Sequence, residues 1–175
     1  LFEPVECSPH DCWSHRVKLT VLIPAYNEAA TIGKVLAAVG QISLPEVSLE
    51  VIVVDDGSTD GTVDEVRRYQ EDHPDGAGPC LVRQANGGKG SAIRAGLREA
   101  TGDYVIVQDA DLEYDPAEIG HLVEAVLRDG ARVVYGSRNQ AGGNPRSYFT
   151  YYWGGKLLSM AVNLLYGSRL TDYAT

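Results

Sequence analysis

Two aspartates separated by one small residue are the side chains with the clearest chemical capacity in this chain. Asp109 and Asp111 follow a short apolar run, and Ala110 between them leaves room for a ligand to approach. Carboxylates in this arrangement can hold one Mg²⁺ or Mn²⁺, which prefers oxygen ligands and keeps positions for phosphate oxygens. Glu113 can add a third oxygen. The spacing therefore predicts a divalent metal site at these three acids.

The same acids also fit the opening of a calcium-binding EF-hand loop, the main alternative for this segment. That loop requires glycine at its sixth position and glutamate at its twelfth. Counting from Asp109, the chain has Tyr114 and Gly120 at these two positions. Because both defining residues are absent, the pattern argues against an EF-hand.

A second acidic pair, Asp55 and Asp56, follows the apolar run at residues 49–54. A carboxylate at a strand end can accept a hydrogen bond from the N–H of a nucleotide base or from a ribose hydroxyl. Hydrolase triads are poorly supported, because no Gly-x-Ser-x-Gly motif occurs and the four histidines lie away from the predicted strand ends. The acidic pair is therefore a candidate nucleotide contact.

A glycine-rich segment, Asn86-Gly-Gly-Lys89-Gly90, superficially resembles a phosphate-binding P-loop. The P-loop pattern fails, since Gly90 follows the lysine and Arg83 occupies the place of the first glycine. A lysine in a turn at a helix N-terminus can still face an anion. The segment alone is a weak signal.

These residues must be positioned by alternating strands and helices. Strands are predicted at residues 17–24, 49–54, 80–83, 104–108 and 132–135, and helices at 31–39, from 62 with a Thr62/Glu65 capping box, at 90–100, and from 115 with Asp115 as its cap. Such alternation predicts an α/β fold with a mostly parallel sheet and helices on both faces. Ligands in these folds bind at the carboxyl ends of the strands.

Composition fits one soluble domain, predicted at residues 17–175 after a tail at residues 1–16. The chain has 175 residues, 44% apolar and 22% charged, with a net charge of −9, which argues against broad nucleic-acid binding. Residues 131–175 nevertheless carry five bases and one acid, a balance that fits either an anionic partner at that end or chance variation over 45 residues. No run of 18 apolar residues and no signal peptide is visible, which predicts a cytoplasmic protein.

The three cysteines do not suggest a disulfide framework and favour a reducing compartment. Cys7, His10, Cys12 and His15 form a conceivable zinc-ligand set, although their spacing is tighter than in common zinc modules. A plain terminal tail is the alternative. The sequence leaves both open.

Several of these motifs together resemble the family 2 glycosyltransferases. They are Val21-Leu-Ile-Pro24-Ala-Tyr26-Asn27-Glu28, Val53-Val-Asp55-Asp56-Gly-Ser-Thr-Asp-Gly-Thr62, Asn86-Gly-Gly-Lys89-Gly90 and Gln108-Asp-Ala-Asp111-Leu-Glu113. Together with a further motif, Val134-Tyr-Gly136-Ser137-Arg138, the pattern resembles the polyprenyl-phosphate and dolichol-phosphate hexosyltransferases. The resemblance implies a GT-A fold, a metal-dependent glycosyltransferase activity and a nucleotide-sugar donor.

The family's residue roles transfer to matching positions in this chain. The resemblance implies a nucleotide-sugar pocket formed by Pro24, Ala25, Tyr26, Glu28, Val53, Asp55, Lys89, Asp109 and Ala110. Within this set, Asp55 would meet the base and Lys89 would lie near the donor. Asp109 and Asp111 would hold the metal, and Asp111 would also be a catalytic residue. Glu113 stands where many members of the family have Gln. Arg138 and Arg146 would bind the acceptor phosphate, with Asp172 near the acceptor.

The implied reaction moves a hexose with inversion from a GDP-mannose or UDP-glucose type donor to a polyprenyl or dolichyl phosphate. A lipid phosphate is already largely ionised near neutrality, whereas a hydroxyl acceptor needs a base such as Asp172. The aromatic, apolar stretch at residues 148–166 fits either a helix at a membrane surface or a buried helix. We therefore expect a peripheral membrane protein that acts at the cytoplasmic face of a membrane. The alternative acceptor is a hydroxyl of a sugar or polysaccharide.

Proteins of other classes remain alternatives. A receiver-like signalling domain also has a parallel sheet and an acidic pair, but it does not need Asp109 and Asp111 at another strand end. A nucleotidyltransferase would release diphosphate, and a non-catalytic nucleotide-sugar binder would bind the donor without turnover. The sequence does not distinguish UDP from GDP donors or fix the oligomeric state.

Overall fold

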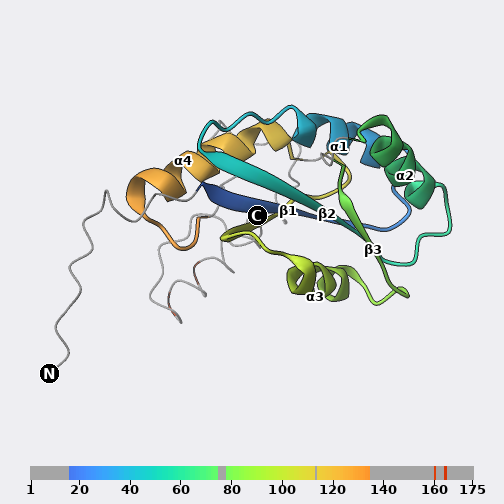
Figure 1. The fold of residues 1–175 in the computed structure, drawn as a ribbon. Helices are drawn as coiled ribbons and strands as arrows, with labels where there is room; N and C mark the ends of the chain where they lie inside the picture. The colour runs from blue at the N-terminus through green and yellow to red at the C-terminus, as the bar shows by residue number, and fades with distance from the viewer. Residues whose placement is uncertain (1–15, 75–77, 113, 135–159, 161–163, 165–175) are drawn as a thin grey trace, which may run out of the picture. The chain divides into compact units, whose positions relative to one another are not determined.

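The computed structural model describes residues 16–74, 78–112 and 114–134, together with Met160 and Leu164. The chain divides into two compact units, residues 1–120 and 121–175. The first unit contains the sheet (Figure 1). Residues 1–15 of the predicted tail lie outside the described residues, and the predicted domain at 17–175 stays a prediction.

The sheet contains four parallel strands in the order β3-β2-β1-β4. The strands are β1 (Val17–Ala25), β2 (Val47–Asp55), β3 (Cys80–Arg83) and β4 (Tyr104–Val107). In the register, Ala25 pairs with Asp55, and Leu22 pairs with both Ile52 and Val107. The predicted α/β fold with a parallel sheet is confirmed, and all four strands lie within two residues of their predicted bounds.

The fifth predicted strand, at residues 132–135, is wrong over the part that the structure describes. Residues 132–134 carry no strand, and Val133 is 68% exposed. A short β-branched run indicates a strand only where a neighbouring strand pairs with it, because β propensity depends on context. Tyr135 lies outside the described residues.

Helices cover both faces of the sheet, as predicted. The first, α1 (Ile32–Gly40), lies with α2 (Thr62–Asp72) over one face, and α3 (Lys89–Glu99) lies over the other (Figure 1). The apolar positions Ile32, Val35, Leu36 and Val39 of α1 are buried. Their spacing places them on one side of the helix, which explains how the sequence pattern specified this packing.

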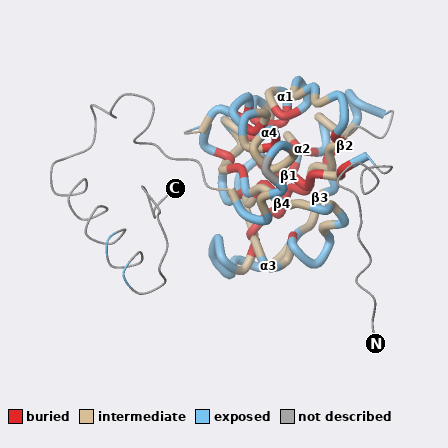
Figure 2. Tube along the Cα trace, turned by 90° about the vertical axis from the view of Figure 1, so that its left-hand side faces the viewer, coloured by how far each residue is buried: buried red, intermediate tan, exposed pale blue. Residues whose placement is uncertain are grey.

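The core lies where the helices meet β1 and β2. Figure 2 shows the buried residues concentrated along these strands, and Leu22 is fully buried. On the α3 side, Leu22, Ile52 and Val54 pack with Ala92. A methyl group at Gly96 would overlap the side chain of Leu22, so glycine lets α3 approach the sheet closely. This approach brings α3, whose first residue is Lys89, close against the sheet.

Beyond β4, a cap and a short helical turn lead into a further helix. The carboxylate of Asp115 accepts a hydrogen bond from Ala117 N at 2.9 Å and caps η1 (Pro116–Glu118), which confirms the predicted cap. Helix α4 (Ile119–Asp129) follows. It ends before Gly130, whose φ of +61° is a conformation that favours glycine at a helix end.

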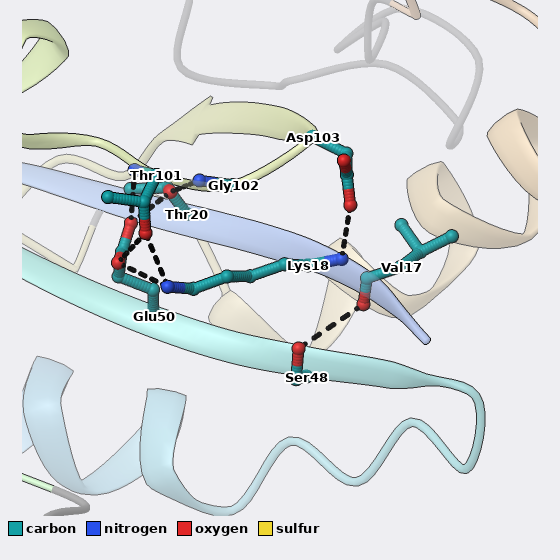
Figure 3. Close-up of polar contacts among 8 residues, drawn as sticks. All are labelled: Val17, Lys18, Thr20, Ser48, Glu50, Thr101, Gly102 and Asp103. Carbon is teal, nitrogen blue, oxygen red and sulfur yellow. Dashed lines mark hydrogen bonds and ion pairs between the residues drawn. The ribbon is translucent and has the colours of Figure 1, made fainter. Parts of the chain in front are cut away.

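A polar cluster fixes the opposite, amino-terminal end of the strands (Figure 3). Glu50 on β2 accepts from Lys18 Nζ and from Thr20 Oγ1, both at 2.6 Å, and from Thr101 N at 2.8 Å. Burial raises the pKa of Glu50, but the Lys18 ammonium and the hydrogen bonds from Thr101 and Thr20 outweigh it and lower the pKa from 4.5 to about 2. The cluster therefore ties the turn before β4 to β1 and β2.

This lowered pKa predicts acid-sensitive stability. A group whose pKa falls on folding stabilises the protein above its unfolded pKa, and that stability is lost as the pH falls from about 5 to about 2. After allowing for partial exposure, we expect a loss of about 2 kcal/mol over this window. Urea unfolding at a series of pH values should show it, and the Glu50→Gln variant should remove most of this slope. Glu46→Gln, on an exposed side chain, controls for the loss of one charge; equal slopes in the two variants would contradict the assignment.

Candidate functional site

A cavity of about 200 Å³ opens at the carboxyl end of the sheet, between the loops that follow β1 and β4. The strand order runs β1, β2, β3 toward one edge, while β4 lies on the other side of β1. Ligands in parallel sheets bind where the order reverses in this way. The cavity is lined by Pro24, Ala25, Tyr26, Glu28, Asp56, Lys89, Ala92, Asp109, Ala110 and Asp111.

The loop after β4 supplies the acidic side of the cavity. Ala110 is buried, the side chain of Asp109 is 25% exposed, and Asp111 is exposed. Gln108 is also buried, and its Nε2 donates to the backbone oxygens of Asp109 and Tyr114, both at 3.2 Å. The amide of Gln108 therefore holds both ends of the loop that carries the two aspartates.

The backbone of this loop is strained directly after Asp111. Leu112 has a φ of +62°, in the left-handed region that a leucine rarely adopts. Such a conformation costs about 1–3 kcal/mol and persists where the surrounding structure enforces it, often at binding sites. The strain is consistent with a loop shaped to direct Asp109 and Asp111 toward the cavity.

A lysine faces the acids from the other side. Lys89 is the first residue of α3, and its Nζ lies 2.6 Å from Asp109 Oδ1. The preceding glycines are held by Asp56, which accepts from Gly87 N at 2.9 Å and from Gly88 N at 2.7 Å. Asp56 is thus the link between the end of β2 and the start of α3.

Asp56 keeps its charge although it is only 3% exposed. Burial raises the pKa of its carboxyl group, but the hydrogen bonds from the Gln84 side chain and from Gly87 N and Gly88 N outweigh burial and lower the pKa below its ordinary value of 3.8. A charged carboxylate accepts stronger hydrogen bonds than a neutral one. The turn before Lys89 is therefore held by a buried anion.

The loop after β1 is fastened to the loop after β2. Asn27, with a φ of +56°, donates from its N to Ser58 Oγ and accepts from Thr59 N at Oδ1, both at 2.9 Å. Glu28 N donates to Thr62 Oγ1 at 2.8 Å. These bonds hold Tyr26 and Glu28 at the rim of the cavity.

The start of α2 differs from the predicted capping box. Its N-cap residue is Gly61, which makes no side-chain capping bond. Asp60 Oδ1 instead accepts from Thr62 N at 2.9 Å. The hydroxyl of Thr62 is unavailable for the box because it contacts Glu28 N and Asp60.

One glycine lets two of these loops approach each other. Gly57 has a φ of +76°, and a methyl group there would lie 2.8 Å from Asn86 N. A side chain is therefore disfavoured both by the backbone conformation and by the lack of space. This close approach brings the end of β2 next to the segment that leads to Lys89.

Two predicted nucleotide contacts do not line the cavity. Val53 is fully buried within β2, and Asp55 is 1% exposed. The Asp55 carboxylate accepts from Ser58 N at 3.2 Å and pairs with Arg83 Nε at 3.5 Å. A nucleotide base therefore reaches this carboxylate only if neighbouring side chains move.

Four predicted site residues lie outside the described part of the chain. They are Glu113, Arg138, Arg146 and Asp172. The possible zinc ligands Cys7, His10, Cys12 and His15 lie outside it as well. The metal, acceptor and base roles given to these residues stay predictions.

The cavity also contains two residues that the sequence analysis did not assign to a pocket. Ala92 lies in the helix that covers the sheet, and nothing in its sequence context marks it. The sequence analysis includes Asp56 in the acidic pair but gives the contact with the base to Asp55 alone. The sequence feature that could have identified it is the acidic pair itself. If one carboxylate of such a pair is bound within its own loop, the other can accept hydrogen bonds from the next loop.

The donor atoms in the cavity suit a hard divalent cation. Within the described ranges, no group of three or more His, Cys, Asp or Glu side chains is placed to hold a metal. Mg²⁺ and Mn²⁺ commonly bind through one or two carboxylates and complete their coordination with substrate phosphates and water. Asp109 and Asp111 fit this pattern, and the ammonium of Lys89 shows that the Asp109 carboxylate already attracts a cation.

Comparison with known sequences gives a consistent result. The family model for glycosyl transferase family 2 matches residues 20–172. A dolichol-phosphate mannosyltransferase of Pyrococcus furiosus is 32% identical over 135 residues, covering 77% of this chain and 37% of that protein. An undecaprenyl-phosphate 4-deoxy-4-formamido-L-arabinose transferase of Aeromonas hydrophila is 36% identical over 159 residues, covering 89% and 46%. The chain thus spans less than half of each relative.

Solved structures agree with the sequence comparison. The mannosyltransferase PcManGT from Pyrobaculum calidifontis, in complex with GDP-Man and Mn²⁺, has a TM-score of 0.57 and 36% identity, covering 71% of this chain and 36% of that one. Glucosyl-3-phosphoglycerate synthase from Mycobacterium tuberculosis, in complex with Mn²⁺, UDP and glucosyl-3-phosphoglycerate, has a TM-score of 0.53 and 25% identity, covering 73% and 46%. Among the described residues of this chain, no helix has the length and hydrophobicity needed to cross a membrane.

Proposed function

The chain belongs to glycosyl transferase family 2 and has its GT-A fold, and from this premise we propose that it transfers a hexose from a nucleotide-sugar to a polyprenyl phosphate. The observation that carries the proposal is the cavity at the reversal of strand order, where Asp109 pairs with Lys89 and Asp111 lines the same cavity. Oxygen ligands on one side and an ammonium on the other are suited to a diphosphate and a divalent cation.

The proposed chemistry requires stabilisation of a leaving nucleoside diphosphate. A bound Mg²⁺ or Mn²⁺ would neutralise the negative charge that develops on the diphosphate. Asp109 and Asp111 would hold that ion, and Lys89 would donate to a phosphate oxygen from the start of α3. Tyr26 and Glu28 would line the part of the pocket beneath the donor. A phosphate oxygen of the acceptor would attack the anomeric carbon of the sugar from the side opposite the diphosphate, so that the bond to the diphosphate breaks and the configuration is inverted.

The proposed acceptor rests on the relatives. Their names give dolichol phosphate and undecaprenyl phosphate as what those proteins act on. In this chain the predicted acceptor residues, Arg138 and Arg146, belong to the basic stretch at 131–175. An acceptor carried by a lipid would place the protein at a membrane surface during the reaction.

A hydroxyl acceptor is the second candidate. A structural neighbour is named as a synthase of glucosyl-3-phosphoglycerate, which is not a lipid product. A hydroxyl must lose its proton during attack, so this reaction would require a base, and Asp172 is the predicted one. The acceptor assay below separates the two.

Nucleotide binding tests the donor site directly. We expect either UDP or GDP, at about 100 times its dissociation constant and with Mn²⁺, to raise the melting temperature by about 5–10 °C. The corresponding nucleoside monophosphate, which lacks the outer phosphate, serves as the matched control and should stabilise the protein less. The donor site would be refuted if neither diphosphate shifted the melting temperature with or without Mn²⁺.

Product analysis tests the reaction. Incubation with the matching sugar donor and a short polyprenyl phosphate should release the nucleoside diphosphate and form a lipid-linked sugar. Release of inorganic diphosphate would indicate a nucleotidyltransferase instead. Transfer to a hydroxyl of a sugar or polysaccharide but not to the lipid phosphate would favour the second candidate.

A further inference from the structure

The ion pair between Lys89 and Asp109 crosses the proposed metal site. Lys89 Nζ lies 2.6 Å from Asp109 Oδ1, and both side chains line the cavity. The Lys89 side chain is 59% exposed and the Asp109 side chain is 25% exposed. One carboxylate oxygen that a metal would use is therefore already paired with a cation of the protein.

The position of Lys89 is costly for the helix itself. It is the first residue of α3, and the first turn of this helix contains no acidic residue. The N-terminus of a helix carries a partial positive charge, which disfavours a lysine there. Stability of α3 does not explain this lysine, whereas a partner of opposite charge across the cavity does.

The backbone that carries Lys89 is fixed from below. Gly88 has a φ of +83°, and its N donates to Asp56 Oδ2 at 2.7 Å. Asp56 itself donates from its N to Ala25 O at 2.9 Å. The start of α3 is therefore tied to the ends of β1 and β2, and the long, largely exposed side chain of Lys89 extends from this fixed point to Asp109.

We propose that Lys89 is the resident counter-ion of Asp109 and makes metal binding conditional on the nucleotide. Without a donor, the ammonium competes with the divalent ion for the Asp109 carboxylate. A bound diphosphate offers the ammonium a second anion, so Lys89 leaves Asp109 as the metal arrives. This inference rests on the proposed function, because it assumes a metal at Asp109 and a diphosphate beside it.

The consequence is a coupling between two ligands that can be measured without any turnover. Two cations at one carboxylate repel each other, so metal alone binds weakly. By linkage, whatever factor the nucleotide adds to metal affinity, the metal adds to nucleotide affinity. Direct contact between metal and phosphate supplies part of this factor in any case, and Lys89 is proposed to supply the rest.

The test uses Lys89→Met, which preserves side-chain length and removes the charge. Mn²⁺ binding is followed by electron paramagnetic resonance and calorimetry, with and without UDP or GDP. In the absence of nucleotide, we expect the variant to bind Mn²⁺ about five- to tenfold more tightly than the unmodified protein. The factor by which the nucleotide raises Mn²⁺ affinity should be smaller in Lys89→Met than in the unmodified protein, by about the same five- to tenfold.

Two further variants complete the test. Lys89→Arg keeps the positive charge and should leave the Mn²⁺ affinity without nucleotide within about twofold. Lys34→Met removes a charge from the exposed surface of α1 and should do the same, which controls for the change in net charge. Circular dichroism checks that each variant is folded.

The outcomes separate the inference from the proposed function. If Mn²⁺ and nucleotide bind cooperatively but Lys89→Met binds Mn²⁺ alone no more tightly than the unmodified protein, the inference is overturned and the proposed function stands. If Mn²⁺ binds to neither protein with any nucleotide, both are overturned. The inference would also be overturned if Lys34→Met bound Mn²⁺ as tightly as Lys89→Met does. The change in net charge of the protein would then explain the effect.

Discussion

Replacing Asp109 with asparagine should lower the catalytic efficiency of sugar transfer about a thousandfold. A metal that neutralises a leaving diphosphate contributes several kcal/mol to transition-state stabilisation, and each 1.36 kcal/mol corresponds to about a factor of ten. Asparagine retains the shape of the side chain but not the charge that faces Lys89 and the proposed ion. The loss should therefore appear in kcat as well as in kcat/KM.

Asp111→Asn should have an effect of similar size, since both carboxylates line the same cavity. The second readout is Mn²⁺-dependent binding of the nucleoside diphosphate, which should be lost in both variants. Asp72→Asn, on an exposed residue at the end of α2, removes the same charge away from the cavity. If both site variants retained Mn²⁺-dependent nucleotide binding within about threefold of the unmodified protein, these aspartates would not hold the ion.

The fold was predictable because its signals are local and repeated. Apolar runs followed by polar residues marked β1 to β4, and the spacing of Ile32, Val35 and Leu36 marked the buried side of α1. The sheet order could not be read from such signals. It is set by which strands pair along the chain, with β4 returning to the far side of β1 after α3 has packed against β1 and β2.

The site was predictable to the extent that strand ends determine it. A parallel sheet brings the carboxyl ends of its strands to one edge, so Tyr26, Asp109 and Asp111 were expected to meet. The division of labour between Asp55 and Asp56 was not predictable. It is decided by which carboxylate reaches the amides of Gly87 and Gly88, and those lie 31 and 32 residues farther along the chain.

The same limitation applies to helix ends. Thr62 and Glu65 have the residue types of a capping box, but Thr62 is fully buried against the loop after β1. A tertiary contact with Glu28 N therefore takes the hydroxyl that the local pattern would assign to the helix. Local patterns identify where the helix begins, and long-range contacts determine how it begins.

Removing the buried carboxylate of Asp56 should affect both stability and binding. Asp56→Ala leaves Gly87 N and Gly88 N without their acceptor, and the Gln84 amide keeps only its hydrogen bond to Ser91 Oγ. Because hydrogen bonds to charged groups contribute about 1.5–3 kcal/mol each and water can replace part of them here, we expect a loss of about 3 kcal/mol in the free energy of unfolding. Urea unfolding at neutral pH measures it. Asp64→Ala, at an exposed position of α2, is the matched control.

The effect on binding distinguishes a positioning role from a purely structural one. If Asp56 positions Lys89, then at a temperature where Asp56→Ala is still folded its affinity for the nucleoside diphosphate should fall about tenfold. Asp56→Asn should lie between, since an amide offers one acceptor oxygen where the carboxylate offers two. The pH gives a further check: the lowered pKa of Asp56 stabilises the protein above about pH 4, and this contribution is lost as the pH falls. A variant destabilised by 3 kcal/mol, as expected above for Asp56→Ala, with unchanged nucleotide affinity would show that the buried anion holds the fold but does not place the lysine.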